Sequence, residues 1–459
     1  MGSGSAAFAA GIKTADIGAR VLIVEDNVIG GTCLDRGCIP SKYLIEVANT
    51  FYTPSKNPFP GVELAAGNLN IRDIIEKKEE LLKELRKEKY WNVLEAYPQI
   101  EYKNLRGKFL DKGVALVGED KVNFGKAIIA IGSKPGIPPG KGIEKVRYYT
   151  SDSIFDIDHL PGRLIMIGGG AIGLEQLGQA FLRLGSEVTI VESFQEIAML
   201  QEPEIRTKLK EILEKEGMNI LTSAKVNNVC EENGKLTLEV EHEGKKITIY
   251  GTDLLIATGR EPNTKDIGLE AISVMTNTRG FIQANEFMQT TNKDIYAAGD
   301  CVGKMMLVTV AAMEGGIAAV NALLGNKKKA DYLSVPNAIF TDPEVAKVGM
   351  DEVEARKRGL EVETRVLDFS KVPRAAISLQ TEGLVKMVVE KNSGKIIGIH
   401  ILAPHGAEII HKAAILVKYG FTIDDVVQMV DVYPTLSESI KLCAQSFKKD
   451  IAKLLCCAE

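Results

Sequence analysis

The sequence predicts an α/β protein in which two units of parallel strands and helices precede a C-terminal α+β domain. Three observations lead to this prediction. A glycine turn that opens a helix, followed by a strand ending in glutamate, occurs near residue 2 and again near residue 168. From about Val335 the pattern changes to mixed strands and helices. The 459 residues are also too many for a single hydrophobic core.

The second glycine turn lies in RLIMIGGGAIGLE, which reads as a strand, a turn and the start of a helix. Gly168, Gly170 and Gly173 have the spacing that permits a tight turn, close approach to a pyrophosphate and helix packing. Glu192 ends the next strand, where an acid would bind an adenine ribose and favour NADH over NADPH. Because strand, helix and acid all occur, we favour a Rossmann-like dinucleotide-binding unit over a purely structural turn.

The first glycine turn repeats this arrangement at the start of the chain. Gly2 and Gly4 precede a helix that runs through Ile17, and the strand RVLIVE ends at Glu25. The strand that should precede Gly2 is missing from the sequence. If the protein begins here, we expect weaker retention of the bound dinucleotide.

Two further segments resemble each other, KAIIAIGSKP with Gly132 and DLLIATGREPN with Gly259. Each is an apolar strand that ends in glycine and a proline-containing turn. The segment DIYAAGD adds a short strand before Asp300, and residues 71–94 have the periodicity of one long helix. We therefore expect four parts, which are a first unit at 1–150, a second unit at 151–262, a return to the first unit at 263–335 and a C-terminal domain at 336–459.

Composition excludes several classes of protein. A net charge of −5 provides no basic surface for nucleic acid. The apolar runs are shorter than the ~20 residues that span a bilayer, and no signal peptide is visible. Seven cysteines include two close pairs, which is typical of redox or metal chemistry in a reducing compartment. We expect a cytoplasmic protein without nucleic-acid or membrane partners.

The first cysteine pair lies in GGTCLDRGCIPSK, where Cys33 and Cys38 are on a turn leading into a helix. Their spacing can bring the two sulfur atoms together, and a helix N-terminus lowers the pKa of a thiol. The structural alternative is two buried cysteines that act as small hydrophobic residues. The flanking Gly-Gly-Thr and Pro-Ser-Lys favour a redox-active pair.

These motifs together resemble those of the pyridine nucleotide–disulfide oxidoreductases, and GGGAIGLE, ATGREPN, IYAAGD and FTDPEVAKVG extend the resemblance over essentially the whole chain. The resemblance implies bound FAD, NADH or NADPH as reductant, and a homodimer whose active sites need both subunits. It also assigns the first unit to FAD, the second to NAD(P) and the C-terminal domain to dimerisation.

The resemblance implies roles for individual residues. Cys38 would lie next to the flavin and Cys33 toward the substrate, with Lys42 near the reactive flavin nitrogen and paired with Glu175. Residues expected to bind FAD are Gly2, Gly4, Glu25, Gly31, Thr32, Lys42, Gly132 and Asp300. Residues expected to bind the nicotinamide dinucleotide are Gly168, Gly170, Gly173, Glu192 and Gly259.

The C-terminal domain departs from the disulfide-reducing members of this family. Those members carry a histidine that exchanges protons with thiols, whereas this chain reads VYPTLSES, with Tyr433 at that place and Glu438 retained. A phenol with a pKa of ~10 is a poor general base at neutral pH. This substitution argues against a lipoamide dehydrogenase, a glutathione reductase or a large thioredoxin reductase. His405 and His411 belong to another motif and do not replace the missing histidine.

The chain ends in KLLCCAE, and this end resembles that of the mercuric reductases, with the adjacent Cys456 and Cys457. Tyr90 and Tyr433 occupy the places of two active-site tyrosines in that group. Thiolates suit a soft ion such as Hg(II). The resemblance thus implies reduction of thiol-bound Hg(II) to Hg(0). The expected metal ligands are Cys33, Cys38, Cys456 and Cys457.

Two alternatives stay open from the sequence. One is another disulfide reductase of the same fold, such as a lipoamide dehydrogenase variant. The other, from a different class, is a non-catalytic thiol protein that sequesters metal. We expect structural roles for the remaining thiols and for three histidines, and hence no histidine-based zinc site. These residues are Cys230, Cys301, Cys443, His159, His242 and His400.

Overall fold

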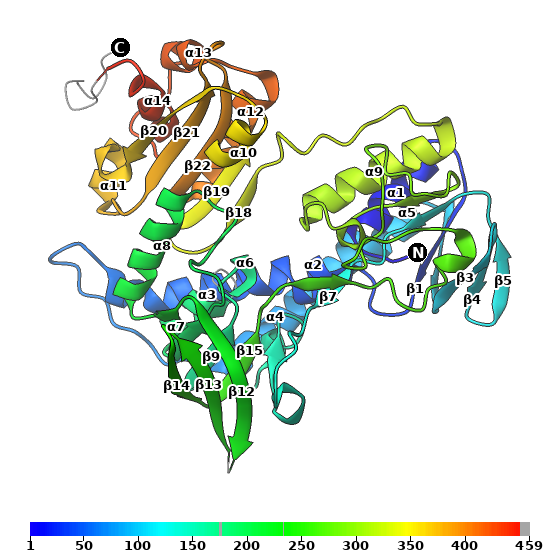
Figure 1. Cartoon of the computed structure of the whole chain (residues 1–459), viewed down its shortest axis with the longest axis horizontal. Coiled ribbons are helices and arrows are strands. Elements are labelled where there is room, and N and C mark those ends of the chain that lie inside the picture. The colour runs from blue at the N-terminus through cyan, green and yellow to red at the C-terminus, as the bar shows by residue number, and fades with distance from the viewer. Residues whose placement is uncertain (174–176, 233, 450–459) are drawn as a thin grey trace.

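A computed structural model of the chain describes residues 1–173, 177–232 and 234–449, and it has the mixed α/β architecture predicted from the sequence (Figure 1). In this view the C-terminal domain lies apart from the helices and strands around the N-terminus, whereas α3 (Cys38–Lys56) of the first unit lies beside α7 (Gln179–Leu184) of the second unit. No helix in the described ranges is long and apolar enough to cross a membrane.

The first unit is built on α1, which starts directly after the glycine turn and packs against α9. Its parallel strand pairs β1–β2 and β6–β17 are connected by the first two residues. The Gly2 amide donates to the Val24 carbonyl over 2.7 Å, and the Ala130 amide donates to the Met1 carbonyl over 2.8 Å. The elements are α1 (Ser5–Asp16), β1 (Val21–Glu25), α2 (Gly31–Arg36), α3 (Cys38–Lys56), α4 (Ile71–Arg86), α5 (Asn92–Ala96), β2 (Ile100–Asn104), β3 (Gly107–Asp111), β4 (Val114–Val117), β5 (Asp120–Asn123), β6 (Ala127–Ile129), β7 (Ser133–Pro135), β17 (Ile295–Ala297) and α9 (Val308–Leu324).

The second unit contains a five-stranded parallel sheet in the order β11-β10-β9-β15-β8. A three-stranded antiparallel sheet, β12-β13-β14, contacts it through β14 and β12. The elements are β8 (Tyr149–Thr150), β9 (Arg163–Ile167), α6 (Ala171–Gly173), α7 (Gln179–Leu184), β10 (Glu187–Val191), α8 (Pro203–Glu216), β11 (Asn219–Leu221), β12 (Ala224–Glu232), β13 (Lys235–His242), β14 (Lys245–Gly251), β15 (Asp253–Ile256) and β16 (Arg260–Pro262).

The C-terminal domain is a five-stranded antiparallel sheet in the order β18-β19-β22-β21-β20, with helices packed against it. Its α+β class agrees with the change of pattern after Val335. The elements are β18 (Asn337–Ile339), β19 (Glu344–Gly349), α10 (Glu352–Lys357), β20 (Val362–Asp368), α11 (Pro373–Ser378), β21 (Leu384–Glu390), β22 (Ile396–Ala403), α12 (Gly406–Tyr419), α13 (Ile423–Gln428) and α14 (Glu438–Gln445).

The two units repeat each other in their hydrogen bonds. In the first unit Gly2 bonds to Val24, and in the second Gly168 donates in the same way to Val191 over 2.9 Å. A Cβ on either glycine would collide with a carbonyl oxygen, that of Ala130 at 2.2 Å or that of Ala257 at 2.5 Å. Both glycines also have a positive φ, so each turn requires glycine for two separate reasons.

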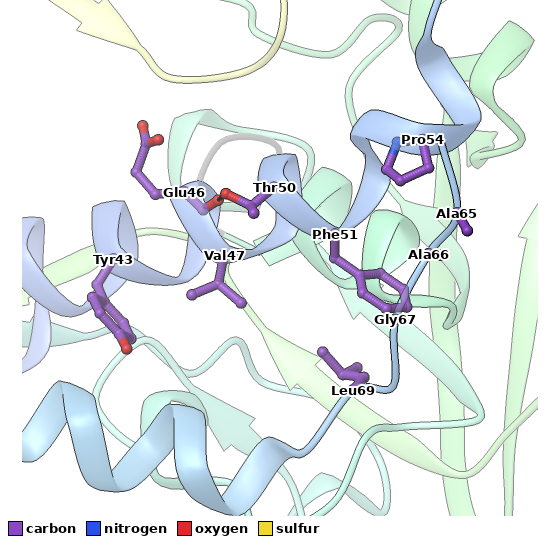
Figure 2. A pocket seen from close by; sticks show the side chains of 10 residues that line it. All are labelled: Tyr43, Glu46, Val47, Thr50, Phe51, Pro54, Ala65, Ala66, Gly67 and Leu69. Carbon is purple, nitrogen blue, oxygen red and sulfur yellow. Dashed lines mark hydrogen bonds between the residues drawn. The ribbon is translucent and has the colours of Figure 1, made fainter. Parts of the chain in front are cut away.

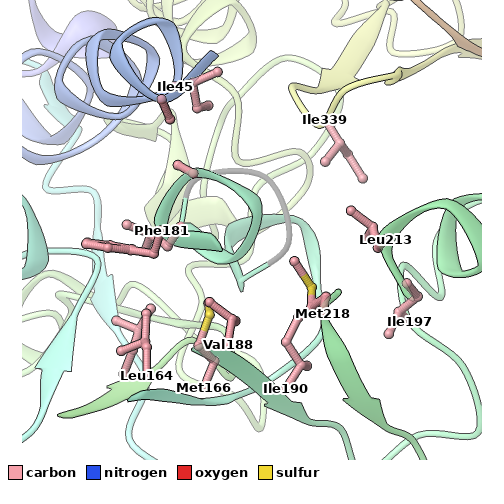
Figure 3. Packing of buried hydrophobic residues seen from close by; sticks show 14 of the residues in the cluster. Ile45, Leu164, Met166, Phe181, Val188, Ile190, Ile197, Leu213, Met218 and Ile339 are labelled. Carbon is pink, nitrogen blue, oxygen red and sulfur yellow. The ribbon is translucent and has the colours of Figure 1, made fainter. Parts of the chain in front are cut away.

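The main hydrophobic core joins all three parts of the chain. It contains apolar residues of the second unit around α7, together with Ile45 from α3 and Ile339 from β18 (Figure 3). Helix α3 begins at Cys38, so burial of its apolar face in this core fixes the direction of the helix that carries the second cysteine.

Two local expectations need correction. The long helix predicted over 71–94 is interrupted by a π-helical turn, Lys87–Trp91, between α4 and α5. Its apolar spacing is compatible with both helix types, so the sequence pattern could not separate them. Cys33 lies within the short helix α2 and not on a turn, because the chain breaks only at Gly37, between the two cysteines.

Candidate active site

A cleft of about 190 Å³ lies between the first glycine turn, the cysteine segment and the start of the segment after β17. Several residues predicted from separate motifs meet at this cleft although they are far apart in sequence. They are Gly4, Thr32, Cys33, Cys38, Gly132 and Asp300. Among the lining residues that were not predicted, the ones with polar side chains are Ser5, Arg36, Ser151 and Arg260.

The two cysteines lie within hydrogen-bond reach of each other, are not joined by a disulfide, and are only partly exposed. A hydrogen bond between their side chains raises the pKa of Cys33, and burial raises it further. Lys42, one turn after Cys38 on α3, has the opposite effect, because its positive charge lowers the pKa of Cys33. The Lys42 ammonium lies 4.3 Å from the centre of the Phe340 ring. The hydrogen bond with Cys38 and burial thus both favour the protonated form of Cys33.

The first unit fits a bound FAD. Helix α1 has Gly4 as its N-cap, with no side-chain hydrogen bond at the cap, so its first N–H groups can bind a phosphate. Gly31, with a φ of 66°, lies against Gly4 so closely that a Cβ there would be 2.6 Å from the Gly4 Cα. The Glu25 carboxylate accepts hydrogen bonds from the amides of Ser3 at 2.8 Å and Asn27 at 2.9 Å. These contacts place an acid at the end of β1, beside the glycine turn.

The second unit has the same arrangement around Glu192. Its carboxylate accepts from the Gly169 amide at 2.6 Å and from the Phe194 amide at 2.8 Å. Gly173 packs so closely against the glycine turn that a Cβ on this residue would lie 2.2 Å from the Gly168 carbonyl oxygen. Among the described residues, no atom lies within 4 Å of a Cβ built on Gly170 or on Gly259. Glu175 lies outside the described residues.

The backbone next to Asp300 is hydrogen-bonded to a side chain of α9. The Gly299 amide donates to the Glu314 carboxylate over 2.6 Å, and the Tyr332 hydroxyl donates to the other oxygen of Glu314 over 2.6 Å. Burial raises the pKa of Glu314. The turn that carries Asp300 is therefore fixed to the helix that packs on α1.

Tyr90 lies on the π-helical turn and reaches the neighbourhood of the cysteines. Its ring packs edge-on against Phe8 at 4.7 Å, and its hydroxyl bonds to Ser5. Burial raises the pKa of Tyr90, and the charge of Cys33 raises it further. The π-helical turn changes the direction of this side chain relative to a regular helix, a feature that often occurs at functional sites.

Tyr433 and Glu438 do not line the cleft of their own chain. Tyr433 is 47% exposed and lies beside Val430 and Val432, which are 96% and 77% exposed. Glu438 starts α14 and is mostly buried, and burial raises its pKa. An exposed apolar segment of this kind is a candidate contact surface.

Cys456 and Cys457 lie outside the described residues. Among the residues that are described, no group of three or more histidine, cysteine or acidic side chains could hold a metal ion. Cys301 and Cys443 are buried, and burial raises the pKa of each to about 12, as expected for unreactive thiols.

A wider, open cavity of about 440 Å³ lies further along α3 (Figure 2). It is mostly apolar, and it is formed by one face of α3 and by residues 65–69. None of the predicted site residues lines it.

Comparison with known proteins gives a consistent result. The family description "Pyridine nucleotide-disulphide oxidoreductase" matches residues 1–315, and its dimerisation domain matches residues 335–444. Mercuric reductases of Lysinibacillus sphaericus and Staphylococcus aureus are each 38% identical over all of this chain, covering 84% and 83% of those proteins.

Two solved structures are similar along nearly the full length. RclA, an HOCl-induced flavoprotein disulfide reductase from Escherichia coli, is 26% identical with a TM-score of 0.85 over 98% of this chain and 99% of that one. LpdA from Mycobacterium tuberculosis is 25% identical with a TM-score of 0.88 over 98% and 99%.

Proposed function

Since this chain belongs to the pyridine nucleotide-disulphide oxidoreductase family and is an FAD-dependent oxidoreductase, we propose that it is a mercuric reductase that converts thiol-bound Hg(II) to Hg(0). The observation that carries this proposal is the pairing of Cys33 with Cys38 at the cleft, in a chain with full-length similarity to mercuric reductases.

The proposed reaction balances without a further reactant. NAD(P)H gives up a hydride, which is two electrons and one proton. The bis-thiolate complex of Hg(II) takes the two electrons, both Hg–S bonds break, and one of the two released thiolates takes the proton. Bound FAD would carry the electrons from nicotinamide to the cysteine pair.

The residues of the cleft would act by ligand exchange. Cys456 and Cys457 of one subunit would capture Hg(II), and Cys33 and Cys38 of the other subunit would take it over, one Hg–S bond replacing another at each step. Only a thiolate attacks efficiently.

Tyr433 would contribute to the site of the neighbouring subunit. It lies on an exposed apolar segment of a dimerisation domain, outside the cleft of its own chain, and this supports a homodimer with shared sites. Tyr90 of one subunit and Tyr433 of the other would then both contact the bound metal. Glu438 would lie next to Tyr433, in the same subunit.

We further propose that NADH is preferred to NADPH and that the enzyme works in the cytoplasm. Glu192 supports the coenzyme preference, because a carboxylate held at the end of β10 would accept ribose hydroxyls and repel a 2′-phosphate. Much higher kcat/KM with NADPH would overturn the preference.

The test is Hg(II)-dependent oxidation of NADH and NADPH by the purified flavoprotein in excess thiol, with volatile mercury trapped. We expect turnover with Hg(0), abolished in Cys33→Ala and weakened in a Cys456→Ala/Cys457→Ala double variant. Stoichiometric Hg(II) binding without coenzyme oxidation would instead identify a metal-sequestering protein.

A second candidate is reduction of a disulfide, which the similarity to RclA favours. Lipoamide, glutathione disulfide and other small disulfides should be assayed in the same preparation. Turnover of a disulfide with no turnover of Hg(II) would replace our proposal by this one. It would also show that Tyr433 can stand in a site that exchanges thiols.

A further inference from the structure

Arg260 is a mostly buried cation at the active-site cleft, and the proposed chemistry gives it no role. It is 10% exposed and begins β16, at the end of the second unit. Its guanidinium Nε donates to the Ser133 hydroxyl over 2.6 Å, and one terminal nitrogen donates to the Ser133 carbonyl over 2.8 Å. The other terminal nitrogen lies 3.5 Å from the Ser151 hydroxyl.

The direction of these hydrogen bonds is fixed by chemistry. A guanidinium can only donate, so the Ser133 oxygen accepts from Arg260. The single hydroxyl hydrogen is then directed to Asp300 Oδ2, 2.6 Å away. Arg260 Nε also lies 3.8 Å from the same oxygen, and Asp300 is the one carboxylate paired with Arg260 in the described part of the chain.

Both contacts of the Asp300 carboxylate use Oδ2, and its backbone turn is fixed separately through Glu314. Among the described residues this leaves Oδ1 free to accept a hydrogen bond from a ligand. Asp300 lines the same cleft as Cys33 and Cys38. A carboxylate held in one rotamer is preorganised to accept hydrogen bonds from the hydroxyls of a polyol chain.

The contact between Arg260 and Ser133 also joins the two dinucleotide-binding units. Ser133 and Arg260 directly follow the two equivalent glycines, Gly132 and Gly259. Their strands β7 and β16 pair antiparallel, and the amides of Gly136 and Asn263 donate reciprocally to Gly259 and Gly132 over 2.9 and 3.2 Å. The arginine from the nicotinamide-binding unit thus reaches the carboxylate of the flavin-binding unit.

We propose that Arg260 is a positioning residue that acts through Ser133 to orient the Asp300 carboxylate toward the ribityl chain of FAD. Its charge also balances that of Asp300 beside the flavin. The inference rests on FAD binding at this cleft, which is a property of the family, and does not depend on the identity of the electron acceptor.

The test compares FAD affinity in variants that remove one contact at a time. Flavin is removed and titrated back into Ser133→Ala, Ser133→Thr and Arg260→Met, with dissociation constants read from quenching of flavin fluorescence. We expect Ser133→Ala to weaken binding about tenfold, the order of one hydrogen bond to a charged group. Ser133→Thr keeps the hydroxyl and should restore most of the affinity. Thr264→Val, which loses a hydroxyl that donates to the Gly280 carbonyl over 2.8 Å, is the matched control and should bind FAD normally.

The flavin midpoint potential separates a positioning role from a merely structural one. Arg260→Met removes a positive charge and should make the potential more negative, whereas Ser133→Ala leaves the charge in place and should change the potential little. Unchanged affinity in Ser133→Ala, or an equal loss with Ser133→Thr, would overturn the inference. Asp300→Asn tests the premise, since normal flavin binding there would mean that Asp300 does not hold the ribityl chain at all.

Discussion

Arg183 on α7 donates a 3.0 Å hydrogen bond to Asp342 Oδ2, and this contact links the second unit to the C-terminal domain. The same guanidinium donates to Glu216 at 2.5 Å and to the Asn49 side chain on α3. Its side chain is 3% exposed. One arginine therefore joins three parts of the chain, including the helix that begins at Cys38.

We predict that Arg183→Met destabilises the folded protein by about 3–5 kcal/mol, because two carboxylates lose their common cation in a buried place. Urea unfolding of the flavin-loaded protein measures the change. Arg163→Met is the matched control, since the Arg163–Glu187 pair is largely exposed at 2.9 Å. That control should cost less than about 1 kcal/mol. Similar losses of unfolding free energy in the two variants would mean that Arg183 stabilises the fold no more than an exposed ion pair does.

Asp342 makes the same junction sensitive to acid. Burial alone would raise the pKa of Asp342, but Lys56 and Arg183 together lower it below its ordinary 3.8. A carboxyl with a lowered folded pKa contributes stability that is present above 3.8 and is lost as the pH falls through the folded value. We expect Asp342→Asn to be less stable than the parent at pH 7 and to lose less further stability as the pH falls below about 5, through the lowered folded pKa of Asp342 in the parent. Parallel stability–pH curves for the two proteins would contradict this.

Local sequence patterns predicted much of the fold. The two glycine turns and the apolar strands around them are contiguous signals, and Glu25 and Glu192 are placed by their distance from the turn. Each acid bonds to the amide after its first glycine, Ser3 or Gly169, as this spacing requires. The C-terminal α+β domain could also be predicted, because the change in periodicity after Val335 is a local signal.

The shell around the active site could not be predicted in this way. Ser133 is 127 positions from Arg260 and 167 from Asp300, and their contact depends on how the two units are placed. The π-helical turn at Tyr90 was missed because its apolar spacing resembles that of an α-helix. A buried arginine such as Arg183 looks like any exposed helix cation, and only the two acids supplied by other elements explain its burial.

The contact between Gly31 and Gly4 predicts a sharp effect on flavin binding. Gly31→Ala would place a Cβ 2.6 Å from the Gly4 Cα, at a φ of 66° that alanine rarely adopts. We expect this variant to be purified with much less FAD than the parent. Gly125→Ala is the control, because a Cβ there meets nothing within 4 Å and its φ is not in the positive range. Flavin content is read from the ratio of flavin to protein absorbance, and an equal ratio in the two variants would refute the prediction.

The hydrogen bond between the cysteines predicts how they react with an alkylating agent. It raises the pKa of Cys33, so removal of its partner in Cys38→Ala should lower that pKa toward its ordinary value. In NADH-reduced protein, Cys33 should then be alkylated by iodoacetamide faster at pH 8 than in the parent, because more of it is thiolate. Mass spectrometry of the labelled peptide follows the rate. A slower rate would show that Cys38 activates Cys33 and does not hold it protonated.

The exposed position of Tyr433 predicts complementation between two inactive subunits. Cys33→Ala homodimers should be inactive toward Hg(II), and Tyr433→Phe homodimers should lose about a hundredfold in kcat, the lower end of what one catalytic proton donor contributes. If Tyr433 acts on the cleft of the neighbouring subunit, a mixed dimer has one site with an intact Cys33, Cys38 and Tyr433. After subunit exchange, the mixture should therefore exceed the summed activity of the two parents. If each chain formed its own site, every site in the mixed dimer would carry one of the two substitutions, and no gain would appear.

Mixing each variant with itself through the same exchange protocol controls for activity lost during the exchange. Native mass spectrometry gives the fraction of mixed dimer, and the gain in activity is scaled to this fraction.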